Sequence, residues 1–90
     1  TGKFLHFDDI QKQTEQILNN ITILLNESGT NLKNIVKCTI YLDNMDNFQK
    51  MNEIYLKFFN FEQLPVRTCI AVKTLPFNAK IEIEFIAIVP

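Results

Sequence analysis

The stretch VKCTIYL, residues 36–42, alternates apolar with more polar side chains from one end to the other. A period of two is typical of a β-strand with one buried face, because successive side chains of a strand point to opposite sides. Asp43 and Asn44 follow as residues that end a strand. The face expected to be buried carries Val36, Cys38, Ile40 and Leu42.

A first helix is predicted before this strand, from about Asp9 to Ser28. Asp8 and Gln11 have the spacing of a capping box, in which each side chain satisfies a free backbone N–H. Apolar residues then recur at spacings of three, four and seven, and Gly29 follows as the expected left-handed cap. The apolar stripe consists of Ile10, Ile17, Leu18, Ile21, Leu24 and Leu25.

A second helix is predicted after the strand. Asp46 and Gln49 have the spacing of another capping box. The apolar residues that follow recur at helical spacing, and Pro65 closes the loop behind them. The side chains expected to point inward are Phe48, Met51, Tyr55, Phe58 and Phe59.

Two further strands are predicted at residues 66–72 and 80–89. In the first, Arg67 and Cys69 share one face. The second becomes apolar on both faces from Phe85, which is typical of a central strand or of a subunit contact. The order helix, strand, helix, strand, strand predicts an α+β fold with two helices on one face of a sheet.

The composition favours one domain over residues 1–90. Its 47% hydrophobic content is high for so short a chain, which buries only part of its surface alone. Three strands are also few to cover two amphipathic helices. We therefore expect further strands before Thr1, or contacts with other subunits, to complete the structure.

Net charge and hydropathy narrow the classes of partner and compartment that the protein is expected to have. A net charge of −1 and a pI near 5.7 argue against nucleic acid, whose partners usually carry a basic excess. No apolar run approaches the ~18 residues that span a bilayer, and no secretory leader is visible. Cys38 and Cys69 lack a CxxC motif and are expected to be reduced thiols. The sequence predicts a soluble, intracellular protein.

Few residues could carry chemistry. His6 is the only histidine, and no cluster has metal-ligand spacing. Arg67 stands out because it projects from the middle of a strand, and its planar guanidinium suits bidentate capture of a carboxylate. Glu82, on the following strand, offers the alternative of a cross-strand ion pair on a solvated face. The pattern alone favours the ion pair.

A set of segments, taken together and in order, forms a specific pattern. It includes the strand with Pro65, Arg67 and Cys69, followed by Leu75-Pro76 and the stretch IEIE at 81–84. The other segments of the pattern are Gln13-Thr14, Asn20-Ile21, Gly29, residues 35–39, residues 52–55 and Phe58-Phe59. Over essentially the whole chain this pattern resembles the RidA family, also called YjgF-like, of reactive-intermediate (enamine/imine) deaminases.

The resemblance implies a chorismate-mutase-like α+β fold with a mixed sheet, assembled as a homotrimer with ligand clefts between subunits. Arg67 is then expected to bind the substrate's α-carboxylate, and Glu82 to position or activate a water. Cys69 is expected to line the cleft, with Asn52 and Tyr55 in the same substrate-binding region. No metal or organic cofactor is implied. Family members usually carry two further strands before the position matching Thr1.

The implied reaction is the hydrolytic deamination of 2-enamino or 2-imino acids to 2-keto acids and ammonia. One alternative is a non-catalytic regulatory trimer that binds 2-keto acids. A weaker one is an RNA-directed activity, as a translation inhibitor or endoribonuclease, against which the acidic pI argues. The expected compartment is the cytoplasm, with the mitochondrion as the second choice.

Overall fold

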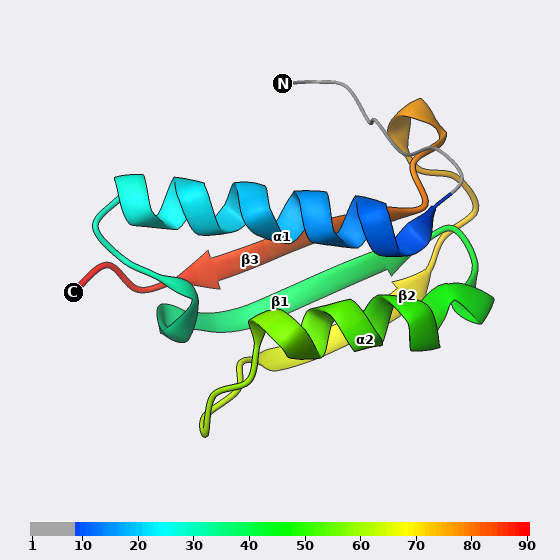
Figure 1. The fold of residues 1–90 in the computed structure, drawn as a ribbon. Coiled ribbons are helices and arrows are strands. Elements are labelled where there is room, and N and C mark those ends of the chain that lie inside the picture. Colours follow the sequence, from blue (N-terminus) through cyan, green and yellow to red (C-terminus); the bar gives the residue numbers. More distant parts are fainter. Residues whose placement is uncertain (1–8) are drawn as a thin grey trace.

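The structure is a computed structural model that describes residues 9–90, and two helices cover one face of its three-stranded sheet (Figure 1). The predicted α+β order of elements is confirmed. Neither described helix is long and apolar enough to cross a membrane. The elements are α1 (Ile10–Glu27), η1 (Leu32–Asn34), β1 (Ile35–Leu42), η2 (Met45–Asn47), α2 (Phe48–Phe58), β2 (Val66–Ala71), η3 (Pro76–Asn78) and β3 (Ile81–Ala87).

The sheet is mixed, with β1 in its centre. β1 runs parallel to β2 and antiparallel to β3, so the strand order is β2-β1-β3. In this described sheet β3 lies at an edge, not in the centre, although its last residues are apolar on both faces. The outward-facing Ile86 of β3 is accordingly 58% exposed.

The N-terminal cap of α1 differs from the predicted capping box. The carboxylate of Asp9 accepts from a backbone N–H of the first turn at 3.0 Å, so the cap lies one residue after Asp8, which is outside the described residues. The Gln11 side chain does not reach back to a capping residue. Its amide donates instead to the Lys50 carbonyl at 3.0 Å and to a Glu53 carboxylate oxygen at 3.1 Å, both on α2. The expected local bond is thus replaced by a link between the two helices.

The C-terminal end of α1 confirms the predicted glycine cap. Gly29 has a φ of +85°, in the left-handed region. The N–H of Thr30 donates to the Leu25 carbonyl at 2.9 Å, and that of Gly29 to the Asn26 carbonyl at 3.2 Å. These two bonds form a Schellman motif, which satisfies carbonyls that the end of the helix would otherwise leave free.

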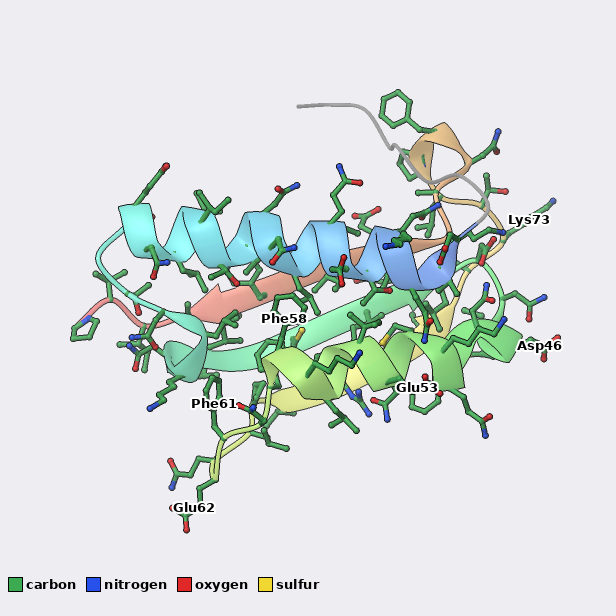
Figure 2. All side chains as sticks on the ribbon, in the orientation of Figure 1. Asp46, Glu53, Phe58, Phe61, Glu62 and Lys73 are labelled. Atoms are coloured by element: carbon green, nitrogen blue, oxygen red, sulfur yellow. The ribbon has the colours of Figure 1, made fainter. Side chains whose placement is uncertain are left out.

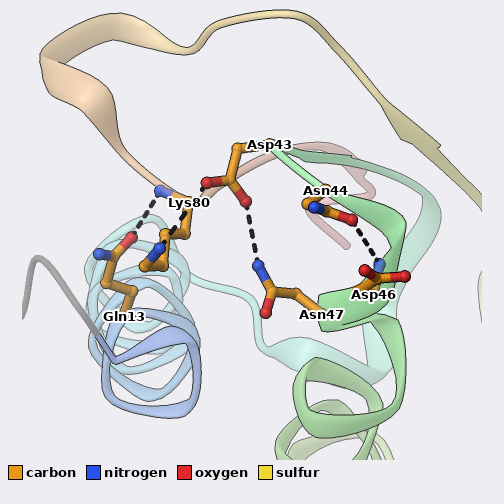
Figure 3. Close-up of polar contacts among 6 residues, drawn as sticks. All are labelled: Gln13, Asp43, Asn44, Asp46, Asn47 and Lys80. Carbon is orange, nitrogen blue, oxygen red and sulfur yellow. Dashed lines mark hydrogen bonds and ion pairs between the residues drawn. The ribbon is translucent and has the colours of Figure 1, made fainter.

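The predicted capping box of Asp46 and Gln49 is wrong. The turn η2 runs directly into α2, whose N-cap is Asn47 and makes no side-chain capping bond. The side chain of Asn44 caps η2 instead and accepts from the Asp46 N–H at 2.8 Å (Figure 3). The extra turn moves the capping contact upstream of the position that the spacing indicated.

Side chains of both helices fill the space between the helix layer and the sheet, with Phe58 partly buried among them (Figure 2). Two predicted core residues are exceptions. Val36 is 44% exposed because a register shift between Ile35 and Lys37 turns Ile35 into the core instead. Leu24 is 53% exposed, on the outer side of α1. The fully buried apolar residues include Leu18, Ile40, Leu42, Met51, Phe59 and Ile81.

None of the described residues 9–90 forms a layer over the sheet face opposite the helices. The alternation predicted for residues 66–72 is correct as far as Ala71, where β2 ends, and Val66 and Ile70 point to this open face, where they are 69% and 45% exposed. Ile86 of β3 lies on the same face as these two residues. An apolar surface shared by two strands is typical of a face that meets another protein surface.

We expect Gly29→Ala to lower the free energy of unfolding by about 1 kcal/mol, because an alanine is strained at positive φ. A Cβ at this position would meet no atom within 4 Å, so the loss comes from the backbone alone. Gly29→Asn is the control and should lose less, since asparagine tolerates this conformation. Urea unfolding of both variants measures the difference, and equal losses would contradict this account.

Candidate functional site

Arg67 lies in β2 with its side chain on the helix side of the sheet, where it is half-buried against α2. Its Nη1 donates to the Asn52 Oδ1. The guanidinium carbon lies 4.6 Å from the centre of the Tyr55 ring and 5.4 Å from that of Phe48. Three residues of one helix therefore hold the guanidinium.

This arrangement leaves Arg67 able to bind an anion. A cation over aromatic faces is stabilised by the ring quadrupoles, and the Asn52 oxygen takes up one of the five guanidinium donors. The remaining donors form the planar fork that binds a carboxylate through two parallel hydrogen bonds. A fixed guanidinium also loses less conformational entropy when it binds a ligand.

Asn52 and Tyr55, both predicted to bind substrate, contact Arg67 in the single chain. Tyr55 is only 3% exposed and stacks on Phe59 with ring centres 4.4 Å apart. Its hydroxyl is hydrogen-bonded to the Cys38 thiol. In the single chain Asn52 and Tyr55 therefore orient the guanidinium of Arg67. The Tyr55 ring has almost no surface left for a ligand.

Two cysteines lie near Arg67, and burial keeps both thiols protonated. Burial raises the pKa of Cys38 to about 11, although the hydrogen bond with Tyr55 and the charge of Arg67 oppose this shift. Burial also raises the pKa of Cys69, again against the effect of Arg67. A protonated thiol is a poor nucleophile. Cys69 therefore suits the lining role expected of it better than covalent catalysis.

Glu82 lies on the opposite face of the sheet from Arg67. Arg67 is paired with Cys38 and faces the helices, whereas Glu82 is paired with Tyr41 and faces away from them. The strand β1 also separates β2 from β3. The alternative of a cross-strand ion pair between Arg67 and Glu82 is therefore wrong, and one chain does not bring the two residues together.

Glu82 borders a hollow of about 310 Å³ beside β3. The walls of this hollow are mostly apolar and include Ile17 of α1 and Phe77 of η3. On the open face the neighbouring Glu84 accepts a hydrogen bond from the Tyr41 hydroxyl at 2.8 Å. A carboxylate at the border of such a hollow can accept a hydrogen bond from a bound water.

Sequence reasoning assigned Phe48 to core packing and missed its contact with Arg67. The spacing of Phe48, Asn52 and Tyr55, at i, i+4 and i+7, places all three on one face of α2. This spacing could have revealed the Arg67 clamp, by which we mean these three residues and the guanidinium that they hold. For metals, the described part of the chain holds no group of three His, Cys, Asp or Glu side chains that could bind an ion. His6 lies outside the described residues.

The sequence comparisons agree with one another. A family profile described as "Endoribonuclease L-PSP" matches residues 1–89. A RutC family protein of Pyrococcus horikoshii is 44% identical over 79 residues, which are 88% of this chain and 62% of that protein. The Arabidopsis thaliana "Reactive Intermediate Deaminase A, chloroplastic" is 45% identical over 97% of this chain and 46% of its own length. The chain thus spans less than two thirds of these relatives.

Solved structures share the same fold. A Thermotoga maritima protein superposes with a TM-score of 0.89 at 40% identity and covers 98% of this chain and 68% of its own. Escherichia coli TdcF with bound serine gives 0.86 at 33% identity, over 98% of this chain and 69% of its own. Among the relatives one is named as chloroplastic and another as mitochondrial, so similarity does not fix a compartment.

We expect the folded chain to lose stability as the pH rises from about 9 to about 11. Cys38 ionises near its ordinary pKa of 9.0 when unfolded, but only at about 11 when folded. The unfolded chain then binds fewer protons, so rising pH favours unfolding. The pKa of Tyr55, raised by burial from 10.0 to about 12, extends the loss to higher pH.

Urea unfolding across this pH range measures the decline. Cys38→Ala should make it shallower, because the buried thiol no longer contributes. Val36→Ala, at a neighbouring position that is 44% exposed, is the control and should leave the slope unchanged. A decline of the same slope in Cys38→Ala and in the unmodified chain would contradict the assignment.

Proposed function

Because the chain belongs to the endoribonuclease L-PSP family, also called RidA or YjgF-like, we propose that it hydrolyses reactive 2-enamino and 2-imino acids to 2-keto acids and ammonia. The observation that carries the proposal is the clamped guanidinium of Arg67. The proposed substrates all bear an α-carboxylate, which is the group that a guanidinium fork recognises.

The proposed chemistry needs only positioning and proton transfer. Arg67 holds the carboxylate and so fixes the position of the adjacent imine carbon. An enamine substrate first tautomerises to the imine. A water held by Glu82 then adds to the imine carbon while Glu82 takes up one of its protons and the imine nitrogen is protonated. The nitrogen takes up a second proton and leaves as ammonia when the C–N bond breaks, and the hydroxyl gives up its proton as the keto group forms. The products are a 2-keto acid and ammonia. Cys69 lines the cleft beside Arg67 with a protonated thiol.

The positions of Arg67 and Glu82 support a cleft between subunits. Since one chain holds them on opposite faces and at opposite edges of the sheet, a site that uses both takes them from two chains. Such a contact joins different surfaces of the two partners, and we propose that it closes into the homotrimeric ring that the family resemblance implies. The exposed apolar residues Val66, Ile70 and Ile86 are then covered by neighbouring copies.

The relatives support a ligand with an α-carboxylate. One relative is named a reactive intermediate deaminase, and TdcF has been crystallised with serine, which carries this group. Because the chain spans only part of these proteins, activity is proposed here and tested on the chain itself. The second candidate function is binding of 2-keto acids without turnover. It is favoured by one observation, namely that each chain completes the Arg67 clamp without Glu82.

We expect the chain to accelerate ammonia release from 2-aminoacrylate generated by a dehydratase. Arg67→Ala should lower kcat/KM by at least about a hundredfold, equivalent to about 3 kcal/mol, because two charged hydrogen bonds are lost. The matched control is Lys33→Ala, which removes a cation from the ring of Phe61, outside the site. Retained activity in Arg67→Ala, with its fold intact, would contradict the proposal.

Mixing two inactive variants tests the intersubunit cleft. Arg67→Ala and Glu82→Gln should each be inactive, and the latter should still bind a 2-keto acid. When equal amounts are unfolded and refolded together, about a quarter of the sites receive both native residues in a ring of identical contacts. Ammonia release should recover to about that fraction. Mixed trimers without recovery would contradict a shared site, and unchanged turnover in Glu82→Gln would contradict the role of Glu82.

A further inference from the structure

Lys80, the residue before β3, is held by contacts with Gln13 of α1 and with Asp43, which directly follows β1 (Figure 3). Its N–H donates to the Gln13 Oε1 of α1 at 2.9 Å. Its carbonyl accepts from the Asp43 N–H, just after β1, at 3.0 Å. Its Nζ lies 3.8 Å from a carboxylate oxygen of the same Asp43. The chain therefore has a fixed path at this residue.

Gln13 supplies this contact from inside the core. Its side chain is fully buried, and 67 residues of sequence separate it from Lys80. A buried amide without hydrogen bonds would cost free energy, so its place in the core depends on partners such as the Lys80 N–H. A polar residue on the buried face of α1 thereby fixes the start of a distant strand.

The start of β3 needs such a contact. The chain reaches the start of β3 from η3, where Phe77 and Asn78 have φ values of 59° and 53°. Residues other than glycine rarely adopt such positive φ values. Within the described sheet β3 is bonded on one side only, to β1. The end of an edge strand is the part that frays most readily. The bond from Lys80 to Gln13 holds this end on the side facing α1.

Glu82 lies two residues after Lys80, at about 3.3 Å per residue along the strand. Ile81 between them is fully buried in the core. We propose that Gln13 is a positioning residue for Glu82: by fixing the N–H of Lys80 it sets where β3 begins and so where the carboxylate meets the water. This role rests on the proposed deaminase function.

The test compares Gln13→Met with Gln11→Met on the same helix. Gln13→Met keeps the length of the side chain but removes the accepting oxygen. Gln11→Met removes the bonds to Lys50 and Glu53 of α2 and leaves β3 untouched. A misplaced catalytic group commonly costs up to about a hundredfold in rate. We expect kcat of Gln13→Met to fall about tenfold to a hundredfold, with KM within about threefold because Arg67 is unchanged.

Two further measurements separate positioning from a general loss of stability. Gln13→Glu retains an accepting oxygen when its buried carboxyl is protonated and should recover part of kcat. Hydrogen exchange of the Lys80 amide should be faster in Gln13→Met but not in Gln11→Met. If Gln13→Met does not fold, Gln13→Asn, whose amide is one methylene shorter, gives the same comparison.

The outcomes distinguish this inference from the proposed function. Absence of turnover in the unmodified chain overturns the deaminase function and the positioning role with it. Turnover in the unmodified chain with equal kcat in Gln13→Met and Gln11→Met overturns the positioning role alone. A rise in KM without a fall in kcat also overturns it, because the loss would then lie in carboxylate binding.

Discussion

The pairing of β1 with a strand on each side is the constraint on which the rest of the structure depends. Its register with β2 and β3 decides which residues of those strands face the helices. Arg67, opposite Cys38, faces them, and Glu82, opposite Tyr41, faces away. Because side chains alternate along a strand, a shift of one residue in either pairing would exchange these faces. The two charged residues of the proposed site are thus placed by one central strand.

The helix α2 both packs on the core and holds the guanidinium of Arg67 in position. A helix of 11 residues without a side-chain cap gains most of its stability from packing, here of Met51, Ile54 and Tyr55. The neighbouring positions on the same side of the helix hold the guanidinium through Phe48 and Asn52. A half-buried charge is costly unless it is paired or solvated. A bound carboxylate would supply the charge that completes this site.

The edges of the sheet connect the fold to assembly. β2 and β3 are the outer strands of the described sheet, and both carry exposed apolar residues on the open face. A small chain with such a surface gains stability by burying it against other copies. The cluster of Gln13, Asp43 and Lys80 acts within one chain and holds the residue before β3 in place. In the proposed assembly, contacts between copies and these internal hydrogen bonds would both bear on the position of Glu82.

The sequence by itself determined the order of the elements, the glycine cap at Gly29 and the alternation that places Arg67 and Cys69 on one face. These features depend on local spacing and backbone conformation, which residue patterns report directly. The family resemblance added the candidate residues of the site. Only the tertiary structure decided that Val36 leaves the core, that Gln11 links two helices and that Arg67 and Glu82 lie on opposite faces. These depend on strand order, register and contacts between distant segments, which no local pattern encodes.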